Sequence, residues 1–119
     1  YGLRLRHRFV WTGDTRPIPE TLSVVANAGE RVFHDCALEG NPSHTGVDDL
    51  LREYSVEFLR RLVAYHYESE HAAARLREHG LSVAQPGERF ELGEVPTSRH
   101  PHTADVLNFK EAGDQPDAA

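Results

Sequence analysis

A periodic apolar stripe between residues 47 and 62 constrains the fold of this chain most strongly. The apolar residues of the stripe recur at steps of three and four: Val47, Leu50, Leu51, Tyr54, Phe58, Leu59 and Leu62. This spacing places them on one face of an α-helix, so the sequence predicts a continuous helix over 47–62. Such a face is stable only when it packs against another apolar surface, which the rest of the chain has to supply.

Short strand-like segments lie before and after this helix. Residues 1–12 have the pattern of one long strand or of a hairpin formed by 2–5 and 9–12. The other strand-like segments are 32–36, 62–65, 81–84 and 89–92. Two shorter helices are predicted over 20–27 and 69–79, with Ser69 as a cap of the second and Gly80 at its end. The sequence therefore predicts an α+β protein.

Composition and charge narrow the class of protein. The chain has 119 residues, of which 39% are apolar and 27% charged, as in ordinary globular proteins. A net charge of -6 argues against a broad basic surface for nucleic acid, although it does not exclude a nucleotide. No apolar run approaches the roughly 20 residues of a membrane span, and the start lacks the apolar core of a signal peptide.

A single cysteine and the absence of methionine bear on the origin of the chain. Cys36 has no partner for an internal disulfide, which fits a reducing compartment, and we expect a buried thiol and a cytoplasmic protein. Because the sequence has no Met and already alternates like a strand at its first residues, we expect a fragment or a processed piece.

Four polar residues lie at strand ends or in the loop just beyond a strand. Asp14 follows Gly13 in a tight turn after the first strand region, Asp35 lies in the strand 32–36, and His66 follows the strand 62–65. His44 lies in a loop dense in turn-forming residues. We expect one edge of the sheet to collect all four. Asp14 then suits a bridging metal ligand and His66 a terminal one; the alternative for Asp14 is an ordinary turn residue.

The remaining histidines offer weaker candidates. His7, His71 and His79 have no converging partners and are expected to be solvated. His34 alternates with Asp35 in a strand, so their side chains point to opposite faces, and we expect a core histidine that bonds to the backbone. His100, Pro101 and His102 form a His-Pro-His unit that could chelate a metal weakly, but the unit lacks nearby carboxylate or thiolate ligands. No nucleophile elbow, phosphate loop or CxxC pair is present.

The order of five motifs resembles the carboxyl-terminal half of the metallo-β-lactamase superfamily, in the branch of ribonuclease Z and phosphodiesterase-like hydrolases. The motifs are VWTGDTRP at 10–17, VFHDC at 32–36, SHTG at 43–46, AYHYES at 64–69 and GLSVAQPGERFEL at 80–92. The resemblance implies that residues 1–92 form one αβ half of a four-layer αββα sandwich. Residues 93–119, which lack periodicity, are expected to form a loosely structured tail.

This resemblance also implies a function. It predicts a zinc-dependent hydrolase, with phosphodiester cleavage by a zinc-bound hydroxide as the leading reaction. Two zinc ions are expected in the complete site, with manganese or iron as alternatives. Asp14 and His66 would be metal ligands, and Asp14, His44 and Asp35 catalytic residues, with His44 contacting the phosphate or the leaving group. The alternatives are an ester or lactone hydrolase, and a non-catalytic binding or assembly subunit that retains half of the fold.

The family's HxHxDH motif and its next histidine ligand are absent from the chain. Two ligands do not hold even one zinc ion in a stable tetrahedral site. A complementary amino-terminal half or a partner chain is therefore expected to supply the rest, which makes the chain inactive by itself and favours a homo- or hetero-oligomer. The expected substrate is a small molecule or a nucleotide or RNA phosphodiester, and no membrane is involved.

Overall fold

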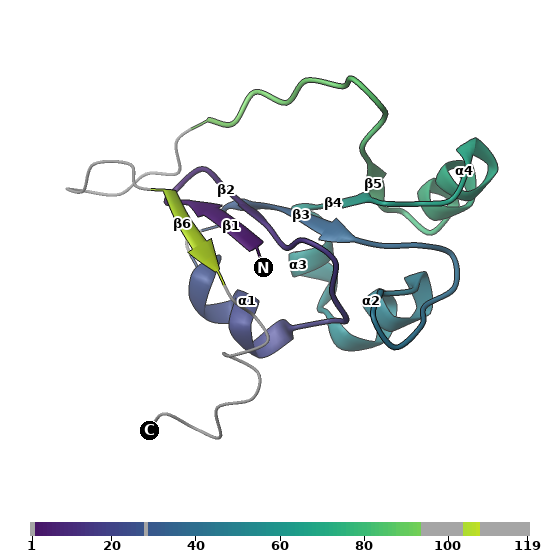
Figure 1. Ribbon diagram of the computed structural model, residues 1–119, viewed down its shortest axis with the longest axis horizontal. Coiled ribbons are helices and arrows are strands. Elements are labelled where there is room, and N and C mark those ends of the chain that lie inside the picture. Colours follow the sequence, from purple (N-terminus) through teal and green to yellow (C-terminus); the bar gives the residue numbers. More distant parts are fainter. Residues whose placement is uncertain (1, 28, 94–103, 108–119) are drawn as a thin grey trace.

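The computed structural model describes residues 2–27, 29–93 and 104–107 (Figure 1). Within them the chain forms six strands and four helices, which confirms the α+β prediction. The elements are β1 (Gly2–Leu5), β2 (Phe9–Trp11), α1 (Pro19–Val25), β3 (Arg31–Asp35), α2 (Val47–Glu53), α3 (Val56–Leu59), β4 (Leu62–Tyr65), α4 (Glu70–Glu78), β5 (Ser82–Val83) and β6 (Ala104–Leu107).

The strands form one mixed sheet in the order β5-β4-β3-β2-β1-β6. Strands β2, β3, β4 and β5 run parallel to one another, whereas β1 is antiparallel to both of its neighbours, β2 and β6. Val10 pairs with Val32, and Val32 with Leu62, so the central strands share one register. This mixed sheet with its helices does not show half of a four-layer αββα sandwich; only the coarser α+β class is established.

One apolar core lies between the sheet and the helices. Val10, Val32 and Leu62 are fully buried there together with Leu22 of α1 and Leu76 of α4. Figure 1 shows α1, α2 and α3 on one side of the sheet. Alternate residues of the strands face the helices because successive side chains of a strand point to opposite faces.

The opposite face of the sheet is aromatic. Trp11 stacks on Tyr65 with ring centroids 6.1 Å apart, and Phe33 contacts Phe9 edge to face. Phe90, from the segment after β5, packs against Phe33 at 5.1 Å. The segment 89–92 covers part of this face but is not a strand, so that prediction is wrong.

The prediction of a continuous helix over 47–62 is also wrong. The helix ends after Glu53 because Tyr54 adopts an extended conformation, with φ -114° and ψ 147°. Ser55 then caps α3 by accepting a hydrogen bond from the backbone N–H of Phe58. Tyr54 remains buried, and its hydroxyl accepts a hydrogen bond from the N–H of Ile18, the residue just before α1. Spacing alone did not distinguish one helix from two with a common apolar face.

The remaining elements follow the sequence more closely. Residues 2–11 form a hairpin rather than one long strand, and His7 in its turn has φ +64°. Ser69 caps α4 by accepting from the N–H of Ala72, as predicted. The segment expected to be a loose tail contains β6, which pairs with β1. His100 and His102 lie outside the described residues.

Candidate metal centre

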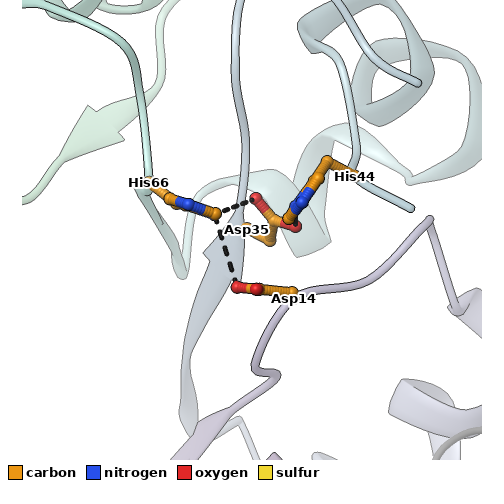
Figure 2. Close-up of side chains that lie close together, drawn as sticks. All are labelled: Asp14, Asp35, His44 and His66. Atoms are coloured by element: carbon orange, nitrogen blue, oxygen red, sulfur yellow. Dashed lines mark hydrogen bonds and ion pairs between the residues drawn. The ribbon is translucent and has the colours of Figure 1, made fainter. Parts of the chain in front are cut away.

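The parallel order of β2, β3 and β4 brings three of the four predicted site residues together. Asp14 follows β2, Asp35 is the last residue of β3, and His66 follows β4. Because these neighbouring strands are parallel, their carboxyl ends lie at the same edge of the sheet. The loop between β3 and α2 returns to this edge and adds His44 (Figure 2).

A tight turn places Asp14 at the rim of this edge. Gly13 has φ +70°, a conformation that glycine adopts without the steric cost of a side chain. Thr12 lies just before it, fully buried, and its hydroxyl donates to the carbonyl of Gly13 and accepts from the N–H of Asp35. The turn is thereby tied to β3, while the Asp14 side chain remains 63% exposed.

Asp35 is the centre of the cluster. Its side chain is completely buried, and one carboxylate oxygen accepts a hydrogen bond from the backbone N–H of Thr15 at 2.9 Å. The same oxygen lies 2.7 Å from Nδ1 of His44, and the other lies 3.3 Å from Nδ1 of His66. The sequence predicted Asp35 as a site residue, but its complete burial between two histidines depends on the tertiary fold.

His66 has a strained backbone. Its φ of +69° lies in the left-handed region, which non-glycine residues seldom occupy outside turns and functional sites. In this conformation Nδ1 of His66 lies 3.3 Å from Oδ1 of Asp14 as well as 3.3 Å from Oδ1 of Asp35 (Figure 2). In the strained conformation, the imidazole of His66 therefore points toward both carboxylates.

The donor atoms of the cluster lie close enough together to be candidate metal ligands. One donor atom from each of Asp14, Asp35, His44 and His66 lies within 4.8 Å of the others. Bonds of about 2.0–2.1 Å in a tetrahedral zinc site place ligand atoms about 3.3 Å apart. The two 3.3 Å separations at His66 match that spacing, whereas the 2.7 Å contact between His44 and Asp35 has the length of a hydrogen bond. The donor set of carboxylates and imidazoles fits zinc.

Asp35 has the largest influence on the pKa of His44. The hydrogen bond from His44 to Asp35 raises the pKa of His44 above its ordinary value; desolvation opposes this shift, and the coulombic attraction of Asp35 and of Asp14 adds to it. A nearby carboxylate favours the imidazolium form. The carboxylates of the cluster therefore favour the protonated form of His44.

A cavity of about 550 Å³ opens beside the cluster. His44 and His66 form part of its wall, and the rest comes from Ala37, Leu38, Glu39, Asn41 and Glu68. Its volume lies within the range of small-molecule sites. A larger cavity of about 610 Å³ is lined by Arg16, Gly40 and Asp49 among others. It contains none of the four cluster residues, so we regard the smaller cavity as the one relevant to the cluster.

His34 belongs to the core, as its alternation with Asp35 predicted. Its Nδ1 lies 2.8 Å from the carbonyl oxygen of Asp35 and its Nε2 2.7 Å from the Tyr54 hydroxyl. Burial lowers the pKa of His34 to about 4 and raises that of the Cys36 thiol to about 12. Both side chains are fully buried and electrically neutral near pH 7.

Sequence reasoning missed the residues that hold the cluster in place. The hydroxyl of Thr45 donates to the carbonyl of Thr15, and Arg16 and Asp49 form an ion pair at 2.7 Å across the base of the His44 loop. Arg16 was visible in the motif that contains Asp14, and Asp49 stands at the third position of a helix start. Their pairing, however, joins positions 33 residues apart.

The fold and the cluster define an α+β protein with a two-aspartate, two-histidine group at the carboxyl edge of its parallel strands. The chain belongs to the family of the Anti-Pycsar protein Apyc1, whose model matches residues 1–90. This span includes all four residues of the cluster. No curated protein matches the chain.

This family corrects the one inferred from the motifs. The matching family is that of the Anti-Pycsar protein Apyc1, and not the ribonuclease Z-like branch of the metallo-β-lactamase superfamily. The functions predicted from that resemblance are corrected with it: a zinc-dependent hydrolase, phosphodiester cleavage, an ester or lactone hydrolase, and an assembly subunit with half of that fold. The family's name describes a protein that opposes Pycsar.

Among the described residues, no helix is both long and apolar enough to cross a membrane.

Proposed function

We propose that this chain takes part in antagonising cyclic-nucleotide signalling in phage defence, and that it recognises the nucleotide through a divalent cation held by Asp14, Asp35 and His66. The family match supports the biological role. The observation that carries the molecular part is the position of the buried Asp35 carboxylate, within 3.3 Å of Nδ1 of His66 and 2.7 Å of Nδ1 of His44.

A cation is needed for electrostatic reasons. The cluster contains two carboxylates, the chain has a net charge of -6, and Glu39 and Glu68 line the adjacent cavity. An anionic phosphate is repelled by such a site. A bound divalent cation reverses the local charge and offers an open position to a phosphate oxygen. Cation binding therefore precedes nucleotide binding.

The four side chains have different roles in this proposal. Asp14, Asp35 and His66 hold the cation in this proposal, which the two separations of 3.3 Å at His66 support. His44 is oriented by its hydrogen bond to Asp35 and contacts the phosphate. Zinc is the leading cation for these ligands, with manganese or iron as alternatives.

The cavity beside the cluster accommodates the rest of the nucleotide. His44 and His66 line this cavity on the side of the proposed cation, and Ala37 and Leu38 add apolar surface. A nucleoside is neutral and carries hydroxyl and amino groups that donate hydrogen bonds to carboxylates such as Glu39 and Glu68. The phosphate at the cation and the nucleoside in the cavity then form one continuous site.

Further ligands come from outside this cluster. Three protein ligands leave coordination positions of this cation open, and the second zinc ion that we propose for the complete site needs additional donors. We propose that another part of the polypeptide or a partner chain supplies them, in a homo- or hetero-oligomer. Light scattering with and without zinc tests this: zinc-dependent association supports a partner chain, and a monomer that binds two ions contradicts it.

The experiment that tests the proposed function measures two binding events by calorimetry. Zinc is titrated first, and then one purine and one pyrimidine 3′,5′-cyclic nucleotide, each with and without zinc. We expect Asp14→Asn and Asp35→Asn to weaken zinc binding and, with it, nucleotide binding. Asp48→Asn is the matched control, because it removes the same charge from α2 outside the cluster.

Two results would contradict the proposal. One is nucleotide binding that is equally tight without a divalent cation, and the other is zinc binding by Asp14→Asn that equals that of Asp48→Asn. In cells, expression of the protein should permit growth of a phage that a cyclic-nucleotide defence otherwise blocks. The Asp14→Asn variant should lose this effect.

A further inference from the structure

Arg16 forms hydrogen bonds to the backbone of the loop that contains His44. Its Nη1 atom lies 3.0 Å from the carbonyl oxygen of His44 itself and 3.2 Å from that of Asn41. The same atom lies 2.7 Å from Oδ2 of Asp49. One nitrogen of Arg16 therefore joins the two ends of the turn 41–44 to the first turn of α2.

Asp49 fixes the position of this charge. It accepts hydrogen bonds from the backbone N–H of Gly46 at 2.9 Å and from Arg52 at 2.7 Å, in addition to Arg16. The hydrogen bond from Arg16 and then that from Gly46 lower the pKa of Asp49 to about 2. Asp49 is thus ionised at neutral pH, and a carboxylate in the first turn of a helix is further favoured by the helix dipole.

The backbone wraps closely around this ion pair. A Cβ atom on Gly40 would lie 2.5 Å from Oδ2 of Asp49 and 2.7 Å from Nη1 of Arg16. A side chain at position 40 would therefore force the ion pair or the backbone of Gly46 to move. The loop is therefore packed against the ion pair and does not merely lie near it.

We propose that Arg16 is a positioning residue, which acts on the candidate site by holding His44 beside Asp35. Arg16 contacts the backbone carbonyl of His44, and the ring of the same residue contacts Asp35. Loss of Arg16 frees the loop and lowers the fraction of molecules in which His44 reaches Asp35. The effect on ligand binding rests on the proposed function, whereas the effect on the loop does not.

Hydrogen exchange of the loop amides tests the first step without any ligand. The N–H groups of Ser43 and His44 donate to the Asn41 side chain, and that of Gly46 to Asp49. Loss of a hydrogen bond to a charged group should speed their exchange in Arg16→Ala by roughly tenfold or more. Urea unfolding shows whether the fold persists; if Arg16→Ala does not fold, Arg16→Gln takes its place.

Arg52→Ala is the matched control. Arg52 binds the same Asp49 carboxylate at 2.7 Å but has no described contact with the loop 41–44. We expect its loop amides to exchange as in the wild type. Arg16→Lys should restore protection, because all three contacts come from one nitrogen and the lysine ammonium carries three donors. Equal exchange rates in Arg16→Ala and Arg52→Ala would overturn the proposal. It would also be overturned if the loop amides of Arg16→Lys exchanged as fast as those of Arg16→Ala.

A double-mutant cycle tests whether Arg16 acts through His44. With zinc in excess, we expect Arg16→Ala to weaken binding of a cyclic nucleotide by about tenfold, as loss of one charged hydrogen bond would. In the His44→Ala background the same change should have no further effect. An equal loss in both backgrounds would show that Arg16 contacts the ligand directly and overturn the positioning role. A wild-type chain that binds no nucleotide contradicts the proposed function alone, since the exchange experiment still decides the role of Arg16.

Discussion

Oδ2 of Asp35 and Nδ1 of His44 lie 2.7 Å apart, and they join the end of β3 to the loop before α2. The Asp35 side chain is completely buried, whereas that of His44 is 27% exposed. Through its other carboxylate oxygen Asp35 also reaches His66, which follows β4. One buried carboxylate therefore holds two histidines from separate segments.

Asp35→Asn should weaken both the fold and the cation site. The amide keeps an acceptor for the N–H of Thr15 but has no charge for His44 and His66. Hydrogen bonds that involve a charged group contribute about 1.5–3 kcal/mol, so we expect a decrease of this size in the free energy of unfolding. Urea unfolding without metal measures it.

Asp14→Asn is the control for that change. Asp14 is 63% exposed, so its replacement should leave the free energy of unfolding within about 0.5 kcal/mol of the wild type while it weakens zinc binding. Equal stability losses in the two variants would contradict the central role given to Asp35.

His66→Gly should be more stable than His66→Ala. Both variants lose the imidazole, but only glycine adopts the φ of +69° without strain. The difference in the free energy of unfolding should be about 1 kcal/mol in favour of glycine. Thermal or urea unfolding measures it, and both variants should bind zinc more weakly than the wild type. If alanine equals glycine at this position, His66 is not strained in solution.

Acidification should destabilise the protein through His34. Burial lowers the pKa of His34 in the folded protein to about 4, compared with 6.5 in the unfolded chain. Between these values the unfolded chain binds a proton that the folded one does not, so stability is complete above pH 6.5 and is lost as the pH falls toward 4. The contribution over this window is about 3 kcal/mol at most.

The His34 effect is isolated by comparing slopes of unfolding free energy against pH. His34→Gln should flatten the slope between pH 6.5 and 4, whatever its effect on absolute stability. His71→Gln, which removes an exposed histidine of α4, should retain the wild-type slope. A wild-type slope in His34→Gln would show that other groups produce the acid sensitivity.

Gly40→Ala should destabilise the His44 loop. The new Cβ would lie 2.5 Å from Asp49 and 2.7 Å from the N–H of Gly46, so either the ion pair or the backbone has to move. Overpacking of this kind costs about 1–3 kcal/mol. Gly93→Ala is the control, since no atom lies within 4 Å of the Cβ position there. Similar unfolding midpoints for the two variants would contradict the close packing around Asp49.

Local patterns in the sequence predicted much of the fold. The hairpin was one of two readings of residues 1–12, β3 and β4 coincide closely with the predicted strands, and α4 begins at the predicted cap. The break at Tyr54 was not predicted because its apolar side chain fits the same stripe on either side. The position of the break depends on the contacts of the Tyr54 hydroxyl with Ile18 and His34, both distant in sequence.

The composition of the cluster was also predicted, since residues that follow neighbouring parallel strands meet at one edge. Whether the cluster binds a cation stays a prediction. The family was not predicted correctly, because short motifs around strand ends resemble more than one family, whereas the family match extends over residues 1–90.

The sequence by itself determined where the central strands β3 and β4 lie and which faces are apolar, because these properties depend on neighbours within a few positions. Only the tertiary structure decided that Asp35 is buried at the centre of the cluster and that Arg16 and Asp49 hold the His44 loop. Those contacts join residues 9 to 33 positions apart, and they form only when the parallel strands and α2 pack together.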